Sequence, residues 1–252
     1  MSVSPRVIIR ATGSWRPQDV ITHTVESQRK ILPEVDAIID ESWANARATL
    51  GDKLFDGPMR RMEKWSAGKQ LELWLSCTSY KPFLGTNLQH AHLADRFGPE
   101  VLANGIGLSA ALQTRDNFLL FGQRNNSVAY YPNRIHPFAG SLESINIFHD
   151  ILRELREELS LQPHNIEDIR CIGIVEDPSL RQPEIVFHVQ SGLTQAEIEA
   201  RLDEKEHEAI IAVHVDRAEL DRAMAGPRFT PVGAGVLQLV RDLAAPTGLN
   251  ER

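Results

Sequence analysis

Three glutamates in the segment Arg153 to Leu159 have the spacing of a metal site. Residues three and four apart lie on the same face of a helix, so Glu154, Glu157 and Glu158 would share one side. No basic residue stands three or four positions from Glu154 or Glu158. Like charges at this spacing repel each other by about 0.2–0.5 kcal/mol per pair. We therefore expect a cation to neutralise them.

The residues around these acids indicate a partly apolar setting. Two apolar rows flank the acids, one of them Phe148, Leu152, Leu155 and Leu159, the other Ile147 and Ile151. The side predicted to face water carries His149, Asp150, Arg153 and Arg156. Loss of hydration raises the pKa of a carboxylate unless a cation compensates. A hard divalent ion, Mg²⁺ with Mn²⁺ as an alternative, meets that need. The competing interpretation is a solvated acidic helix in which Arg153 pairs with Glu157.

The same segment resembles the Nudix box of the Nudix hydrolases. That box reads Gly, five residues, Glu, seven residues, Arg-Glu-aliphatic-any-Glu-Glu, any, Gly, aliphatic. The match is carried by Ala139-Gly140, Glu143 and the run from Arg153 to Glu158. The interval from Gly140 to Arg153 is one residue short, the middle Glu of the box falls near Ile145 or Asn146, and Ser160 replaces the closing Gly.

The resemblance implies a fold, a cofactor and residue roles. It implies an α/β (α+β) fold, the Nudix α/β/α sandwich with a mixed sheet. It implies Mg²⁺ held by Glu154, Glu157, Glu158 and the backbone carbonyl of Ala139, with Glu157 and Glu158 central to catalysis. Arg153 would hold Glu157 or a loop carbonyl in place, or form a surface ion pair worth about 0–1 kcal/mol.

Further segments resemble the Nudix branch that cleaves UDP-glucose and UDP-galactose in animals, and its plant relatives. They are Leu54 to Pro58, Thr78 to Asn87, Gly105 to Ala111 and Phe118 to Phe121. The resemblance makes Tyr80, Thr86 and Asn87 candidates to read a base or sugar, and Arg124 a candidate phosphate contact. Glu184 would line the pocket. The alternative for each is an ordinary turn, strand-edge or surface residue.

A general base outside the helix is predicted just before the strand Ala209 to Val215. Glu204, Glu206 and Glu208 precede this strand, and His207-Glu208 resembles a His-Glu pair of the same branch. We select Glu208 as fourth ligand or base. A solvated charge run is the equal alternative.

Composition limits the class of protein. A net charge of −7 over 252 residues disfavours a nucleic-acid surface, which needs a basic footprint. The sequence has no run of eighteen apolar residues, and Met1 to Trp15 lacks a signal-peptide core. We expect a cytoplasmic protein without a membrane partner, and the sequence leaves its oligomeric state open, a homodimer among the options. Cys77 and Cys171 are predicted to be buried free thiols.

Two parts are predicted along the chain. Residues 1–104 would form a small α+β part that contributes to substrate binding, with a strand at Val7 to Ile9, a helix from Pro33 to Leu50 and a strand around Leu71 to Leu75. Residues 105–252 would form the Nudix domain. Its strands are predicted near 108–113, 118–122, 172–175, 185–189 and 210–215, and its later helices at 195–202 and from 230.

These observations predict a Mg²⁺-dependent Nudix hydrolase that cleaves a nucleoside diphosphate sugar. UDP-glucose or UDP-galactose is the favoured substrate, and UMP and a sugar 1-phosphate are the products. The first alternative is a Nudix pyrophosphatase for another small nucleotide, such as ADP-ribose or a dinucleotide. The second is a noncatalytic nucleotide-binding module, because the short loop and the missing middle Glu would affect water placement.

Overall fold

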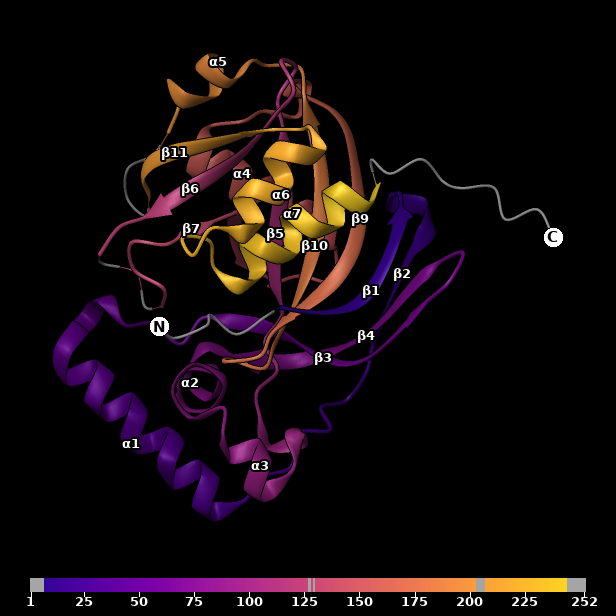
Figure 1. The fold of residues 1–252 in the computed structure, drawn as a ribbon. Helices are drawn as coiled ribbons and strands as arrows, with labels where there is room; N and C mark the ends of the chain where they lie inside the picture. The colour runs from indigo at the N-terminus through magenta and orange to yellow at the C-terminus, as the bar shows by residue number, and fades with distance from the viewer. Residues whose placement is uncertain (1–6, 127, 129, 203–206, 244–252) are drawn as a thin grey trace.

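One mixed sheet of eight strands dominates the computed structural model, which describes residues 7–126, 128, 130–202 and 207–243 (Figure 1). Its order is β1 (Ile8–Trp15), β9 (Ile166–Asp177), β10 (Gln182–Ser191), β5 (Gly107–Gln113), β6 (Phe118–Arg124) and β11 (His207–His214). β7 (Ile135–His136) pairs with β6, and β8 (Phe138–Ser141) pairs with β5. β10 and β5 run parallel, whereas the other neighbours run antiparallel.

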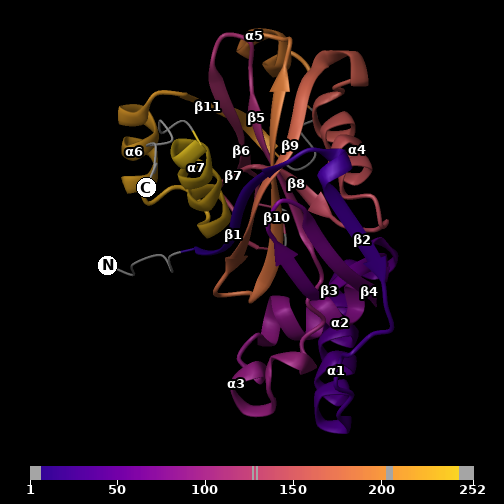
Figure 2. The same ribbon diagram turned by 90° about the vertical axis from the view of Figure 1, so that its right-hand side faces the viewer.

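Helices cover both faces of this sheet (Figure 2). α4 (Ile147–Leu159) packs on one face through the fully buried side chains of Ile151 and Leu155. α7 (Pro231–Leu243) packs on the other through Val236 and Leu237, with α6 (Arg217–Ala225) beside it. The predicted α/β fold with a mixed sheet between helices is therefore confirmed.

A smaller sheet of three strands lies in the lower part of Figure 1. Its order is β2 (Val20–Thr24), β4 (Leu71–Ser79) and β3 (Pro58–Ala67). The helices near it are α1 (Pro33–Leu50), α2 (Tyr80–Phe83) and α3 (Leu93–Phe97), whereas the short α5 (Gln195–Glu199) lies at the opposite end of the molecule. α1 begins at Pro33 and ends before Gly51, which has a φ of +58°, as the sequence predicts.

The two predicted parts share the large sheet. β1 comes from the N-terminal part but pairs with β9. Backbone hydrogen bonds also join the parts, from Arg60 N to the Leu142 carbonyl (2.7 Å) and from Ile106 N to the Arg60 carbonyl (2.9 Å). Leu142 directly precedes the loop that leads into α4, so the N-terminal part supports that loop. A boundary at residue 104 stays a prediction.

Two further expectations can be compared with the fold. Cys171 is buried, but Cys77 is exposed, so the prediction of two buried thiols is wrong for Cys77. Cys77 lies opposite Arg60 on β3, whose Nη1 is 3.1 Å from its sulfur. None of the helices in the described part of the chain combines the length and apolar character that a membrane crossing requires.

Asn87 fastens the N-terminal part to the β9–β10 turn, and Thr86 beside it holds the N-terminal part together. Both side chains are fully buried in a π-helical turn, Leu84–Leu88. Asn87 Nδ2 donates to the carbonyls of Leu180 (3.0 Å) and Arg181 (3.2 Å), and its Oδ1 accepts from Asn104 N (2.9 Å). Thr86 Oγ1 donates to the Pro82 carbonyl (2.6 Å) and accepts from Ala103 N (3.0 Å). These bonds give both residues a positioning role, and their predicted contact with a base or sugar stays a prediction.

Replacing Asn87 by Ala should destabilise the fold. The substitution leaves the Asn104 amide and two carbonyl groups without partners in a buried site, so we expect a loss of about 2–4 kcal/mol in the free energy of unfolding. Urea titration followed by circular dichroism measures it. The matched control is Asn45→Ala on the exposed side of α1, which should change stability by less than about 0.5 kcal/mol. Equal effects of the two substitutions would contradict the fastening role.

Candidate active site

Asp150 shapes the loop that leads into α4. Its Oδ2 accepts hydrogen bonds from the backbone amides of Glu143 (2.9 Å) and Ser144 (2.7 Å), and its Oδ1 accepts one from Ser144 Oγ (2.9 Å). Burial opposes ionisation of Asp150, but the hydrogen bonds led by the Ser144 amide outweigh it and lower the pKa. The prediction that Asp150 faces water is wrong, because the loop folds back over the helix and covers it.

Glu154 lies against the backbone of β8. A Cβ atom added at Gly140 would stand 2.0 Å from Glu154 Cδ, so only glycine leaves room for this side chain. Burial raises the pKa of Glu154 to about 8; Arg153 opposes that rise, and Glu158, Glu157 and Glu143 add to it. The expected desolvation of an acid set among apolar rows is therefore present.

Arg153 is the local counter-charge of the acidic face. Its Nη2 lies 2.8 Å from Glu154 Oε1 and 3.1 Å from Glu143 Oε1, and its Nη1 lies 3.5 Å from Glu157 Oε2. The expectation that Glu154 lacks a helical cation is thus wrong, because the long arginine side chain bends back to its chain neighbour. The expected contact with Glu157 is present but is the longest of the three.

His207 is the residue that β11 brings to the acidic helix. Its Nε2 lies 3.5 Å from Oε1 of Glu158, and both side chains are buried. Gly122 on β6 makes room for the ring, because a Cβ there would stand 2.2 Å from His207 Nδ1. None of the roles predicted from the sequence falls on His207 itself. The alternation of a strand supplies the signal, since an inward His207 implies an outward Glu208.

Glu208 points away from this cluster. Its side chain is exposed, and its Oε1 accepts a hydrogen bond from Gln123 Nε2 (2.7 Å). Its choice as a fourth ligand or base stays a prediction, and it would require the start of β11 to rearrange. The neighbouring candidates Glu204 and Glu206 lie outside the described residues.

Arg124 is a buried cation at the end of β6. It is 7% exposed, lies opposite His207 in the β6–β11 register, and its Cζ lies 4.6 Å from the centre of the Tyr130 ring. Within the described residues, no carboxylate lies within 4.0 Å of its guanidinium and its Nε has no hydrogen-bond partner. A buried charge without a close counter-ion is costly, so the site is suited to bind an anion.

Glu184 is buried on β10, near enough to Arg124 to feel its charge but without an ion pair to it. It accepts a hydrogen bond from Ser109 Oγ and packs against Gly107. Burial raises the pKa of Glu184 to about 7; the Ser109 hydrogen bond and the charge of Arg124 oppose the rise, and Asp177 adds to it. The alternative of a strand-edge acid that faces water is therefore wrong.

The acidic face has the donors for a divalent cation. Within the described parts of the chain, no three His, Cys, Asp or Glu side chains are already arranged around an ion position. The donor set nevertheless fits one, because Glu154, Glu157 and Glu158 are oxygen ligands on one helix face, and the pKa of Glu154 is raised by burial and by the neighbouring acids in the absence of a cation. Ala139, paired with Ser109, stays a predicted carbonyl ligand.

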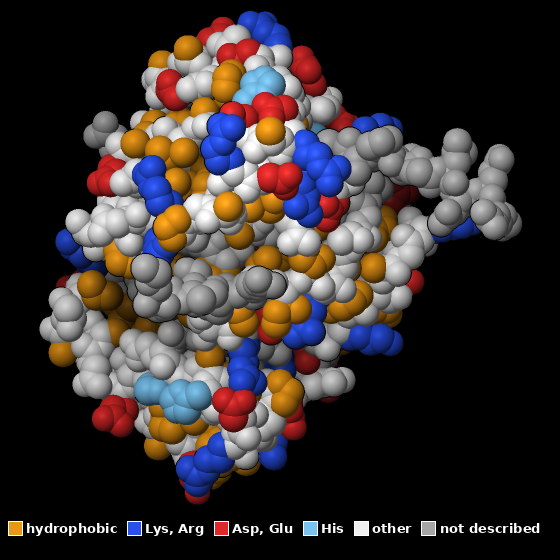
Figure 3. Space-filling view, in the orientation of Figure 1, with side chains coloured by type: hydrophobic (Ala, Val, Ile, Leu, Met, Phe, Trp, Pro, Cys, Tyr) orange, Lys and Arg blue, Asp and Glu red, His pale blue; other side chains and the backbone are white. Residues whose placement is uncertain are grey.

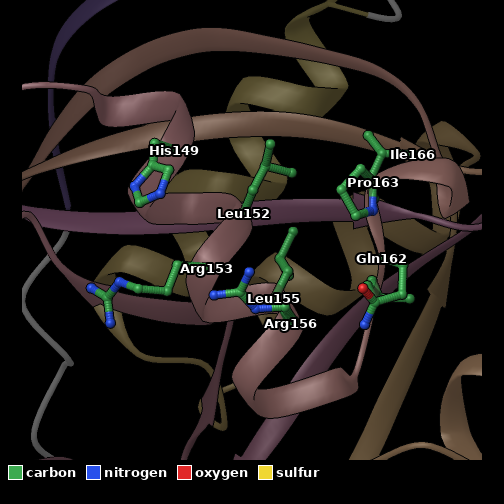
Figure 4. A pocket seen from close by; sticks show the side chains of 9 residues that line it. His149, Leu152, Arg153, Leu155, Arg156, Gln162, Pro163 and Ile166 are labelled. Carbon is green, nitrogen blue, oxygen red and sulfur yellow. The ribbon is translucent and has the colours of Figure 1, made fainter.

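A hollow on the outer side of α4 lies apart from the acids. Figure 4 shows that its walls come from α4 and from the segment after it, with Leu152, Leu155, Pro163 and Ile166 among the lining residues. No carboxylate of the described residues lines it, and its volume of about 150 Å³ is below the 300–1,000 Å³ usual for a ligand pocket. It is not the active site.

The chain is similar in sequence to curated mammalian proteins. No family model matches the chain. The chain is 28% identical over 229 residues to the uridine diphosphate glucose pyrophosphatase NUDT22 of Homo sapiens, covering 76% of this chain and 75% of that protein. It is 29% identical over 220 residues to the protein of the same name from Mus musculus, covering 74% and 71%. A mutT/nudix family protein from Listeria innocua superposes with a TM-score of 0.43 at 15% identity over 56% of this chain and 93% of that one, which is too distant to carry an argument.

This chain resembles the UDP-glucose branch of the Nudix hydrolases. The resemblance predicted from the sequence and the enzyme class that it implies, a Nudix hydrolase, are confirmed by these relatives. The Nudix box also explains two positions of the structure. Its first glycine, Gly140, is the residue that Glu154 approaches. Its closing glycine is replaced by Ser160, which ends α4 with a left-handed φ of +53°, a conformation that favours glycine.

The stability of the protein should depend on pH through Glu184. The unfolded group ionises near pH 4.5 and the folded group near pH 7, so the unfolded chain loses its proton first and stability falls as pH rises between these values. Above pH 7 the cost is on the order of 3 kcal/mol. Glu184→Gln removes this cost of ionisation, so the free energy of unfolding of the variant relative to the native protein should rise from pH 5 to pH 8.

Urea titrations at pH 5, 6, 7 and 8 measure this difference. Ser109→Ala is the matched variant, because it removes a hydrogen bond that favours the ionised carboxylate and should move the window to higher pH. Parallel pH curves for the native protein and Glu184→Gln would show that Glu184 does not hold its proton in the folded state.

Proposed function

We propose that this chain hydrolyses the diphosphate linkage of a nucleoside diphosphate sugar. UDP-glucose or UDP-galactose is the favoured substrate, and water adds across the P–O–P bond to give UMP and a sugar 1-phosphate. One juxtaposition carries the proposal. Glu158, a buried acid of α4, lies 3.5 Å from His207, and His207 lies opposite Arg124, a buried cation with no carboxylate within 4.0 Å among the described residues. Side chains suited to bind a metal cation thus lie close to a side chain suited to bind an anion.

The names of the relatives support this choice of substrate. The human and mouse proteins are called uridine diphosphate glucose pyrophosphatases, and the matches span roughly three quarters of this chain. The cytoplasmic location predicted from the sequence belongs to the same proposal, and cell fractionation would test it.

The side chains divide the work of binding and orientation. Glu154, Glu157 and Glu158 would hold Mg²⁺, which when bound neutralises phosphate oxygens and activates water. Arg153 positions Glu154 and Glu157 through its contacts at 2.8 and 3.5 Å. Arg124 would bind a phosphate oxygen through its guanidinium, whose Nε has no hydrogen-bond partner among the described residues. The Asp150 hydrogen bonds fix the loop between β8 and α4. The general base stays unassigned between Glu208 and another group.

Glu158→Gln should reduce turnover of UDP-glucose about a hundredfold or more. The substitution keeps the shape of the side chain and removes a charge that stabilises the transition state through the metal. Purified protein with Mg²⁺ is assayed by chromatography for UMP release from UDP-, ADP- and GDP-linked sugars, ADP-ribose and dinucleotides. Arg156→Gln on the exposed side of α4 is the control and should keep normal turnover.

Each outcome of that assay has a definite meaning. Activity on another nucleotide alone would replace the substrate but keep the enzyme class. Binding without turnover of any substrate would favour a noncatalytic nucleotide-binding module. Normal turnover by Glu158→Gln, together with inactivity of Glu208→Gln, would move the catalytic centre from α4 to the start of β11.

Millimolar Mg²⁺ should raise the thermal midpoint of unfolding. An ion that binds only the folded protein stabilises it by mass action, and here it also relieves repulsion among the acids. Differential scanning fluorimetry with Mg²⁺ or with EDTA measures the shift. Glu158→Gln should shrink the shift and Arg156→Gln should retain it. An unchanged midpoint in an active protein would mean that the metal enters only with the substrate.

A further inference from the structure

A cavity of about 570 Å³ lies where the N-terminal part meets the large sheet. Leu50 of α1, Tyr80 of α2 and Leu84 line one side, and Tyr130, Tyr131 and Leu180 line the other. Its volume falls in the range of 300–1,000 Å³ that is usual for small-ligand sites. In Figure 3, hydrophobic side chains gather at the left where the lower part of the molecule meets the large sheet.

The walls of this cavity suit an aromatic ring better than a sugar. Three tyrosines and several leucines line it, and no Asp, Glu, Lys or Arg is among its lining residues in the described part of the chain. A hexose presents hydroxyl groups on every side and needs many polar partners, whereas a nucleobase presents two apolar faces that stack on tyrosine. Gln89 and Ser179 supply a few hydrogen-bonding groups for the edge of a base.

Apolar surface is left exposed at this cavity. Leu50 is 49% exposed although it is a large hydrophobic residue of the lining. Tyr80 is held from behind by Trp43 and Phe83, each with its ring centre 6.4 Å away, so its ring is supported at a fixed position. A flat ligand that enters the cavity would cover the leucine without moving the tyrosine.

The cavity connects directly to the proposed phosphate anchor. Tyr130 lines the cavity, and the Arg124 guanidinium lies 4.6 Å from the centre of its ring. Tyr131 follows with a φ of +50°, a strained value for a bulky residue, which places two consecutive tyrosines on the cavity wall. A nucleotide whose base enters the cavity would therefore extend its phosphates toward Arg124 and the acids of α4.

We propose that this cavity binds the nucleobase of the nucleotide substrate. The base lies among Tyr80, Tyr130 and Leu180, the diphosphate is directed to Arg124, and the sugar leaves the cavity on the side of α4. This assignment rests on the proposed function for the identity of the whole substrate, but base binding can be measured without catalysis. It places base selection in contacts that the N-terminal part shares with the loops of the large sheet.

The test compares two substitutions in the cavity with one outside it. Ala46→Trp fills the cavity from α1, Tyr80→Ala removes a stacking surface, and Ala48→Trp adds the same bulk to an exposed position of the same helix. Isothermal titration with UMP in EDTA gives base binding without metal or turnover, and glucose 1-phosphate serves as a probe that lacks a base. Thermal midpoints confirm that each variant is folded.

Tyr80→Ala removes one base-stacking contact, and Ala46→Trp occupies the space of the base. We therefore expect each substitution to raise the Kd for UMP by about tenfold or more. Both should leave the binding of glucose 1-phosphate unchanged, and Ala48→Trp should bind UMP normally. Unchanged UMP affinity in both cavity variants, or weakened binding of glucose 1-phosphate alone, overturns the assignment. If the native protein cleaves no nucleotide sugar but the cavity variants still bind UMP more weakly than the native protein, the proposed function fails and the base site stands.

Discussion

The contact of Glu154 with Gly140 is the constraint on which the site depends. The carboxylate can occupy this place only because residue 140 has no side chain, since a Cβ would stand 2.0 Å from Glu154 Cδ. β8 is fixed by its pairing with β5, and α4 is fixed by Ile151 and Leu155 in the core, so neither element can withdraw. The acid is thereby held in a partly dry position, and its pKa rises to about 8. The burial that builds the core also creates the demand for a cation.

The two arginines at this site have opposite electrostatic surroundings. Arg153 lies close to three acids and holds the face of α4 together. Arg124 is buried behind Tyr130 without a close acid among the described residues. Because Arg153 is already paired, it has little capacity left for a ligand, whereas the Nε of Arg124 has no hydrogen-bond partner among the described residues. The division between a positioning arginine and an anion-binding arginine follows from their partners and not from residue type.

Local patterns in the sequence predict much of the fold but less of the site. Pro33 and Gly51 bound α1 as predicted, and the acidic helix is present, because these signals act within one helix. The roles of Asp150, Thr86 and Asn87 depend on partners from other segments, so helical position or turn chemistry alone misplaces them. His207 was overlooked beside Glu208 because a charge run does not reveal which side of a strand faces inward. β2 and β3 lack a clear alternation and emerge only as neighbours of β4.

The N-terminal part cannot be separated from the chemistry on α4. Arg60 Nε donates to the Glu143 carbonyl (3.1 Å), and Glu143 in turn contacts Arg153, so β3 reaches the acidic face through a single residue. Asn87 holds the carbonyls of Leu180 and Arg181, and Leu180 is a wall of the base cavity. The proposed base site and the proposed metal site therefore depend on the same few connections. A change of base specificity can arise in α1 or α2 while the acids of α4 stay fixed by the core of the large sheet.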